Sequence, residues 1–141
     1  MKKIIICLSA LLLIVGCSST PDYTPKLINN DKKILDLLDY FKDYGFKIDH
    51  IQPLVSEHLH AEEAFAASID GQEIGIYRFD LKFDKAKKKV SRTIQTKTFY
   101  IQATPFKAIV NGSFIVVNCD KHLRGKEIAK VFKLFPKKLN L

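Results

Sequence analysis

Two dipeptides that favour tight turns place the strongest constraint on what this chain can fold into. Asp70-Gly71 and Asn111-Gly112 each lie between two runs rich in apolar residues. Asp-Gly and Asn-Gly are preferred in two-residue hairpin turns, where both residues adopt a positive φ angle. The sequence therefore predicts two β-hairpins and a sheet with antiparallel neighbours.

The two turns also predict which residues face each other across each hairpin. The first turn pairs Ala67 with Ile74 and Phe65 with Ile76, and the second pairs Ala108 with Ile115 and Phe106 with Val117. After residue 76 the apolar residues change face, which indicates either a β-bulge near residues 76–77 or a strand covered on both sides. The second hairpin is apolar on both faces, which is typical of buried strands. We expect it at the centre of the sheet.

Apolar residues at helical spacing predict a helix at each end of the domain. The first helix would begin near Asp31, a good N-cap residue, and end near Gly45. The second would cover residues 126–135. The apolar residues that recur at three- and four-residue spacing are Ile34, Leu37, Leu38 and Phe41 in the first helix, and Ile128, Val131, Phe132 and Phe135 in the second.

The remaining segments are less regular. Residues 84–96 predict a short basic helix or a loop, residues 99–103 alternate as a strand, and residues 46–63 match neither period. A short helix fits within residues 55–64. We expect an α+β fold in which an antiparallel sheet of about four to five strands, including the two hairpins, is packed by an N-terminal and a C-terminal helix.

The first seventeen residues have the pattern of an export signal. Lys2 and Lys3 form a positive start, residues 4–15 carry no charge, and the run ends at the small residue Gly16. This order of charged, apolar and small residues is typical of secretory signals. The apolar run is too short for a membrane-spanning helix, which needs about 20 residues.

The end of this run reads Leu13-Ile14-Val15-Gly16-Cys17 and resembles the lipobox of bacterial lipoproteins. The resemblance implies transfer of diacylglycerol to the Cys17 thiol, with or without an N-acyl chain, and cleavage before Cys17. Two or more acyl chains make a stable anchor. We therefore expect lipid attachment at Cys17 and a location on the extracytoplasmic face of the cell membrane. An ordinary cleaved signal or an uncleaved anchor is the alternative.

Cleavage would leave 125 of the 141 residues, which is enough for one domain. We expect a signal peptide at residues 1–16, a lipidated tether at residues 17–30 and a single α+β domain at residues 31–141. Cys7 would leave with the signal and Cys17 would carry lipid, so Cys119 is the one thiol left and no internal disulfide can form. The fold then depends on its hydrophobic core.

The charge of the chain is unevenly distributed. Residues 17–84 carry 7 basic and 13 acidic side chains, whereas residues 85–141 carry 14 basic and 2 acidic ones. If the fold gathers these cations, they form one positive face. Outside a bacterial membrane the available polyanions are lipid headgroups and cell-wall polymers, so we expect one of these rather than nucleic acid as the partner. Lysines that only solvate the surface are the simpler interpretation. The sequence identifies no protein partner.

Two groups of residues suggest chemistry. Cys119 lies three residues before His122, which suggests a thiol-dependent or hydrolytic enzyme if the imidazole can deprotonate the thiol. His58 and His60, with Glu62 and Glu63 beside them, suggest a metal site with a distant third ligand such as His50 or His122. The spacing matches no zinc motif. A buried thiol and solvent-facing histidines are the alternatives, and we assign no catalytic residue, metal ligand or cofactor.

The stretches around residues 69–80 and 108–116 resemble those of a group of small, uncharacterised lipoproteins of Gram-positive bacteria. The likeness covers much of residues 46–135, and its motifs are mainly turns and strands. It implies a compact domain of sheet and helices, without a catalytic or binding residue to transfer. We expect a membrane-anchored extracytoplasmic lipoprotein that acts as a non-enzymatic binding or interaction module. The thiol enzyme and the metal-binding lipoprotein remain alternatives.

Overall fold

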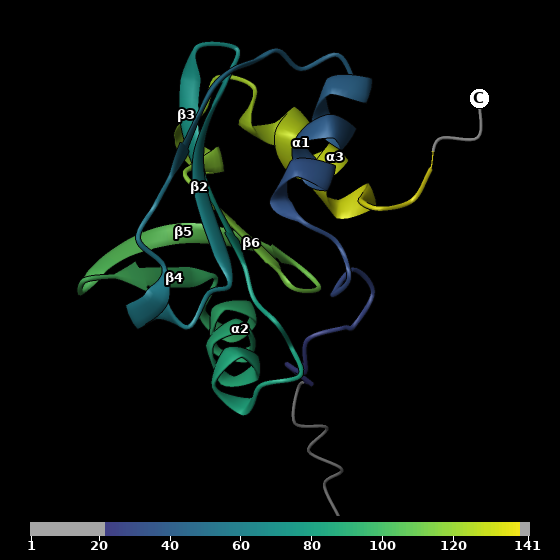
Figure 1. Cartoon of the computed structure of the whole chain (residues 1–141). Helices are drawn as coiled ribbons and strands as arrows, with labels where there is room; N and C mark the ends of the chain where they lie inside the picture. Colours follow the sequence, from purple (N-terminus) through teal and green to yellow (C-terminus); the bar gives the residue numbers. More distant parts are fainter. Residues whose placement is uncertain (1–21, 139–141) are drawn as a thin grey trace, which may run out of the picture.

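The computed structural model describes residues 22–138, which form six strands, three α-helices and two short 3-10 turns (Figure 1). In chain order the elements are α1 (Ile34–Asp43), β1 (Ile48–Pro53), η1 (Glu57–Leu59), β2 (Glu63–Ile69), β3 (Gln72–Arg78), α2 (Asp84–Thr96), β4 (Thr98–Ile101), β5 (Thr104–Asn111), β6 (Phe114–Val117), η2 (Cys119–Lys121) and α3 (Gly125–Leu134).

All six strands belong to one sheet in the order β1-β2-β3-β6-β5-β4, and every neighbouring pair is antiparallel. The chain makes two successive units, each a helix followed by three strands, and the units meet where β3 pairs with β6. The expected α+β class with one antiparallel sheet is confirmed. The expected four to five strands are wrong, because β1 adds a sixth strand. Helix α2, which opens the second unit, adds a third helix to the two expected at the ends of the domain.

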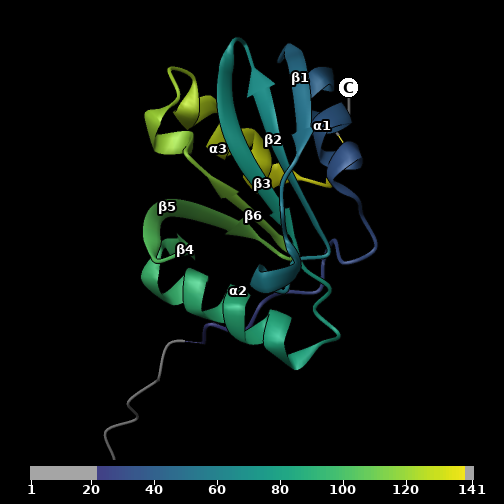
Figure 2. The same cartoon turned by 60° about the vertical axis from the view of Figure 1, so that its left-hand side comes forward.

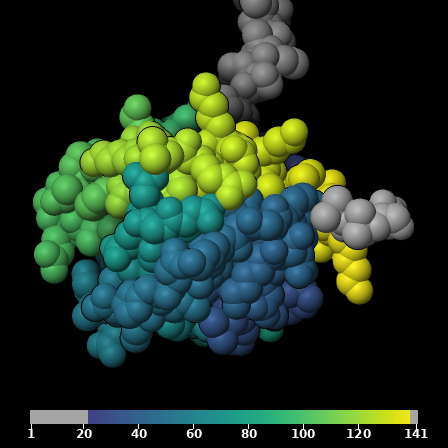
Figure 3. Space-filling model, turned by 90° about the horizontal axis from the view of Figure 1, so that it is seen from above, coloured from purple at the N-terminus to yellow at the C-terminus, as the bar shows by residue number. Residues whose placement is uncertain are grey.

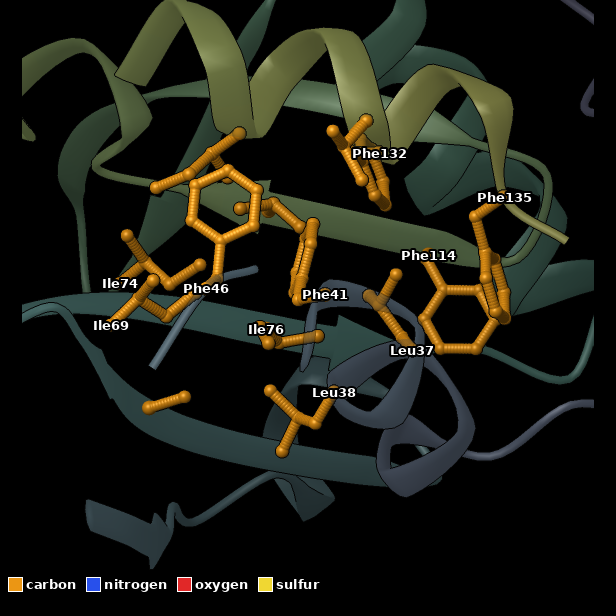
Figure 4. Close-up of a cluster of buried hydrophobic side chains, with 14 of the residues drawn as sticks. Leu37, Leu38, Phe41, Phe46, Ile69, Ile74, Ile76, Phe114, Phe132 and Phe135 are labelled. Atoms are coloured by element: carbon orange, nitrogen blue, oxygen red, sulfur yellow. The ribbon is translucent and has the colours of Figure 1, made fainter. Parts of the chain in front are cut away.

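The helices cover both faces of the sheet. Side chains of α1 and α3 pack on one face around Ile76 and Phe114 (Figure 4). On the other face, Ala86 and Val90 of α2 pack against Tyr77 and other residues of the central strands. Figure 1 shows α1 and α3 together to the right of β2 and β3, and α2 below the strands. Each fully buried large side chain in these two layers contributes about 1.5–3 kcal/mol to folding.

The first hairpin forms as expected. Ala67 faces Ile74 and Phe65 faces Ile76, and the β2–β3 register runs without a shift from Ile69 to Glu63. The change of face after residue 76 therefore does not come from a β-bulge. It arises because β3 is buried on both sides, since helices cover both faces of the sheet.

The second hairpin forms with a different register. The structure pairs Ala108 with Val117 and Val110 with Ile115, so the turn consists of Gly112 and Ser113. The expected pairing through an Asn111-Gly112 turn is therefore wrong by two residues. Asn111 is instead the last residue of β5, and its Nδ2 donates hydrogen bonds of 2.7 Å to the carbonyl oxygens of Phe132 and Phe135. It thereby caps the C-terminus of α3.

The strand missing from the sequence prediction is β1, at one edge of the sheet. Its apolar residues Ile48 and Ile51 are three apart because the register shifts between Ile48 and His50. A bulge of this kind destroys the period of two that identifies a strand. At the other edge, the expected strand at residues 99–103 ends at Ile101. Gln102 and Ala103 form a tight turn, with φ angles of 47° and 64°.

The segment before α1 is fixed to the sheet by two asparagines that the sequence pattern placed in the tether. The Nδ2 of Asn29 donates to the Asn111 carbonyl at 3.0 Å, and its Oδ1 accepts from the Ser113 backbone N–H at 2.8 Å. Asn30 donates to Asp80 at 3.0 Å and accepts from the Leu81 N–H at 2.8 Å. Asn29 is fully buried. Both residues are therefore part of the folded domain.

Arg78, at the end of β3, holds the same segment from the opposite side. Its guanidinium donates to the carbonyl oxygens of Asn30, at 2.8 Å, and of Lys32, and it forms an ion pair with Glu62. Only 4% of Arg78 is exposed. A buried cation is tolerated when carbonyl and carboxylate oxygens satisfy its donors. This arginine therefore joins the chain entering α1 to the centre of the sheet.

Candidate functional site

Cys17 and the rest of the expected signal lie outside the described residues. The described chain starts at Asp22, so lipid attachment at Cys17 stays a prediction from the sequence pattern. No helix within residues 22–138 has the length and apolar character needed to cross a membrane.

Cys119 lies at the start of η2, directly after β6, and is buried with 7% of its surface exposed. It contributes to the lining of two hollows, of about 430 Å³ and 870 Å³. Burial, together with the nearby Asp120 carboxylate, raises the pKa of the Cys119 thiol to about 12. The thiolate is the nucleophilic form of cysteine. Cys119 is therefore almost entirely an unreactive thiol at neutral pH.

His122 is close to Cys119 in the chain, but its ring is engaged elsewhere. Nε2 lies 2.7 Å from the carbonyl oxygen of Ile69, and Nδ1 accepts a hydrogen bond of 2.9 Å from the backbone N–H of Arg124. This pair of partners requires the neutral tautomer with its proton on Nε2. Neither nitrogen is free to accept a proton from Cys119. The imidazole instead joins the end of β2 to the start of α3.

The larger hollow beside Cys119 is bordered by the loop between η2 and α3. Leu123 of this loop is 92% exposed, and Arg124 forms ion pairs with Asp70, at 2.5 Å, and with Glu127, at 2.7 Å. The Arg124 guanidinium also lies over the Phe46 ring, 4.1 Å from its centroid. In Figure 3 the yellow-green residues of η2 and α3 lie beside the teal residues of β2 and β3. These contacts hold the Arg124 side chain at the edge of the hollow and pair its charge with two carboxylates.

The candidate metal ligands do not converge. His58 lies in η1 and His60 directly after it, and both are exposed. His60 lines a hollow of about 500 Å³ together with Glu62, Asp80 and Asp84. Across residues 22–138, no group of three or more histidine, cysteine, aspartate or glutamate side chains is placed to hold a metal ion. A stable transition-metal site needs such a set.

The basic C-terminal half does not form one positive face. Most of its cations lie on α2 or on α3, and these two helices pack against opposite faces of the sheet. The exposed cations of α2 include Lys87, Lys88 and Arg92, and those of α3 include Lys126, Lys130 and Lys133. The uneven charge of the sequence therefore becomes two separate basic surfaces, one on each side of the molecule.

The α2 surface adjoins the start of the described chain. Thr24 and Pro25 line a hollow of about 510 Å³ together with Lys87, Lys88 and Arg92 of α2. In Figure 2 the purple segment that follows residue 21 passes beside α2. The direction in which the chain leads to its N-terminus is thus the α2 side of the domain.

Sequence reasoning missed the buried polar residues that hold the N-terminal segment. Asn29 and Arg78 occur where the sequence shows only a polar linker and the end of an apolar strand. The one available signal was the arginine itself, because an arginine within a strand buried on both sides needs several acceptors. The contacts of Asn29 and Arg78 position the N-terminal segment relative to α2, and their role is structural.

No protein-family model, no curated protein and no solved structure matches this chain. The function therefore has to be inferred from the residues and their arrangement.

Proposed function

We propose that this chain is a bacterial lipoprotein, cleaved before Cys17 and held by lipid on the extracytoplasmic face of the cell membrane. The observation that carries the proposal is the order of features in residues 1–17: two lysines, an uncharged apolar run, and Leu13-Ile14-Val15-Gly16-Cys17. A cysteine directly after a small residue at the end of such a run is the attachment point that a lipobox provides.

The way in which the domain begins supports this proposal. Asn29 is the first buried residue of the described chain. Eleven residues therefore lie between Cys17 and Asn29, a separation of twelve residue steps. Fully extended, they span at most about 40 Å. The anchor would hold the domain close to the bilayer, within reach of its surface.

We further propose that the domain is a non-enzymatic binding or interaction module. The thiol alternative is weakened because Cys119 is protonated at neutral pH and both nitrogens of His122 have backbone partners. A nucleophile needs a base that can accept its proton. The metal alternative is weakened because His58 and His60 are exposed and belong to no group of three ligating side chains within residues 22–138.

Intact-mass measurement and membrane fractionation of the expressed chain test the anchor. We expect the wild-type protein to lack residues 1–16, to carry diacylglycerol and to sediment with membranes. The Cys17→Ala variant should be unlipidated, whereas Cys7→Ala should be processed like the wild type because residue 7 lies within the signal. An unmodified Cys17 in the wild type, or equal lipidation of the Cys17→Ala variant, would contradict the proposal.

A further inference from the structure

Helix α2 presents a dense cationic surface that its fold does not neutralise. Its inner side buries Ala86, Val90 and Thr93 against the sheet. Five cations occupy the rest of the helix, against one acid at its first position: Lys85, Lys87, Lys88, Lys89 and Arg92, with Asp84. None of the ion pairs between described residues includes a cation of α2. These charges are therefore available to an external anion.

The described start of the chain lies on the α2 side of the domain. Thr24 and Pro25 lie against the exposed side of α2, and Asn29 and Arg78 hold the following residues on the sheet. Seven residue steps separate Cys17 from Thr24, so the chain reaches at most about 25 Å between them. A domain of this size is roughly 35 Å across. An anchored domain can therefore bring α2 to the bilayer surface more easily than α3.

We propose that the exposed face of α2 docks on anionic phospholipid headgroups of the membrane in which the chain is anchored. This inference rests on the proposed lipid attachment at Cys17. Lys87, Lys88 and Arg92 supply the charge, and Lys26 in the adjoining segment is also exposed. Docking orients the domain with α2 toward the bilayer, and α1 and α3 turned away from it.

Two further observations favour a bilayer as the occupant of this surface. Leu27 and Ile28 follow Lys26 in the same segment and are 64% and 53% exposed. Exposed apolar side chains beside cations are typical of protein surfaces that lie in the headgroup region. The helix also offers a row of separate charges rather than an enclosed pocket, which matches a surface of many headgroups better than a single small ligand.

Helix α3 provides a matched comparison, because it carries as many exposed lysines on the opposite side of the sheet. At physiological ionic strength the electrostatic potential of a membrane falls off over about 8 Å. Lysines that lie farther than this from the bilayer contribute little to docking. Neutralising three cations on α2 should therefore weaken docking strongly, and neutralising three on α3 should not, although both changes alter the net charge equally.

The test uses the mature, lipidated chain, residues 17–141, in vesicles of phosphatidylcholine with about one third phosphatidylglycerol, and in vesicles of phosphatidylcholine alone. A fluorophore on Gln95→Cys reports the distance of α2 from an acceptor dye on the headgroups, and a fluorophore on Leu123→Cys reports the loop before α3. We expect strong energy transfer from the α2 label in the anionic vesicles. We expect weak transfer from the other label, and weak transfer from both labels in neutral vesicles.

The triple variant K87Q/K88Q/R92Q should lower the docking equilibrium about 100-fold, since each cation near an anionic surface contributes about fivefold. The variant K126Q/K130Q/K133Q should leave the α2 signal unchanged. High salt should have the same effect as the first variant. If both triple variants act equally, or if the α2 label is no closer to the bilayer than the α3 label, the docking proposal is wrong.

Two other outcomes have distinct meanings. If the wild-type chain fails to float with either kind of vesicle, the lipid anchor itself is wrong. If polyglycerol phosphate added to neutral vesicles binds the chain through Lys87, Lys88 and Arg92, while phosphatidylglycerol does not attract the α2 label, the surface recognises a wall polymer. That result would overturn the assignment to a lipid surface and leave the anchor intact.

Discussion

Replacement of Asn29 by alanine should destabilise the domain substantially. The substitution removes the donor to the Asn111 carbonyl and the acceptor for the Ser113 backbone N–H, both at buried positions. Ser113 Oγ keeps a partner, because it also lies 3.1 Å from the Asn29 carbonyl oxygen. The Ser113 N–H thus loses its acceptor, and the Asn111 carbonyl loses one donor. Each loss costs about 1–3 kcal/mol. We expect a loss of about 3 kcal/mol in the free energy of unfolding.

Thermal and urea unfolding of the protein, followed by circular dichroism, measure this loss. In a domain of this size about 3 kcal/mol lowers the melting temperature by about 10 °C. Leu27→Ala is the matched control, because Leu27 is exposed in the same segment and its truncation should change stability by less than about 0.5 kcal/mol.

Equal melting of the two variants would refute the reasoning. It would mean that the segment can detach from the sheet, that water satisfies Asn111 and Ser113, and that residues 22–33 are not a structural part of the domain. In that case the position of the segment beside α2 would also lose its support.

Three further predictions concern other parts of the fold. Burial raises the pKa of Cys119 to about 12. Alkylation of this thiol at pH 8 should therefore be at least 1,000-fold slower in the native protein than in urea. Rapid labelling of the native protein would show that the thiol is not buried. The Arg124 side chain, together with a backbone hydrogen bond, lowers the pKa of Asp70. The stability that Asp70 contributes is therefore present above its unfolded pKa, near 4, and is lost as the pH falls toward the lower folded pKa. Asp70→Asn should destabilise the protein at pH 7 and have little effect near pH 2, whereas a pH-independent difference in urea midpoints would exclude this ion pair as the cause. Gly125→Ala should lower the free energy of unfolding by about 3 kcal/mol in the same assay, because a Cβ at the start of α3 would clash with the carbonyl oxygen of Cys119. A variant as stable as the wild type would show that the two backbones do not approach each other this closely.

The elements that could be predicted from the sequence are those with a regular pattern and a local turn signal. The β2–β3 hairpin has both, since Asp70-Gly71 joins two runs in a simple register. The helices α1 and α3 carry full apolar stripes. Even so, the sequence predicts the β5–β6 turn at Asn111-Gly112, one residue before its place at Gly112-Ser113, and the cross-strand partners therefore shift by two. The local preference of Asn-Gly favours the predicted turn, whereas the C-terminus of α3 needs the Asn111 side chain. A hydrogen bond between residues this far apart in the chain cannot be recognised from the local sequence.

The remaining errors have equally specific causes. The edge strand β1 is bulged and half exposed, so Ile48 and Ile51 do not alternate. Helix α2 buries few side chains and is otherwise basic, which made a helix and a loop hard to distinguish. For the candidate site, the nearness of Cys119 and His122 in the sequence says nothing about ring orientation. The partition of the lysines onto two faces of the sheet depends on the topology, which charge counts do not contain.

The attachment of the N-terminal segment to the sheet also determines how the domain bears mechanical load. A pull on this segment meets Asn29 first, and through it the turn between β5 and β6. It then meets Arg78, at the end of β3. Because β3 and β6 are the two central strands, the force enters the middle of the sheet instead of peeling away an edge strand or unwinding α1. Many hydrogen bonds must then break together, so tension on the N-terminus is borne by the most stable part of the fold.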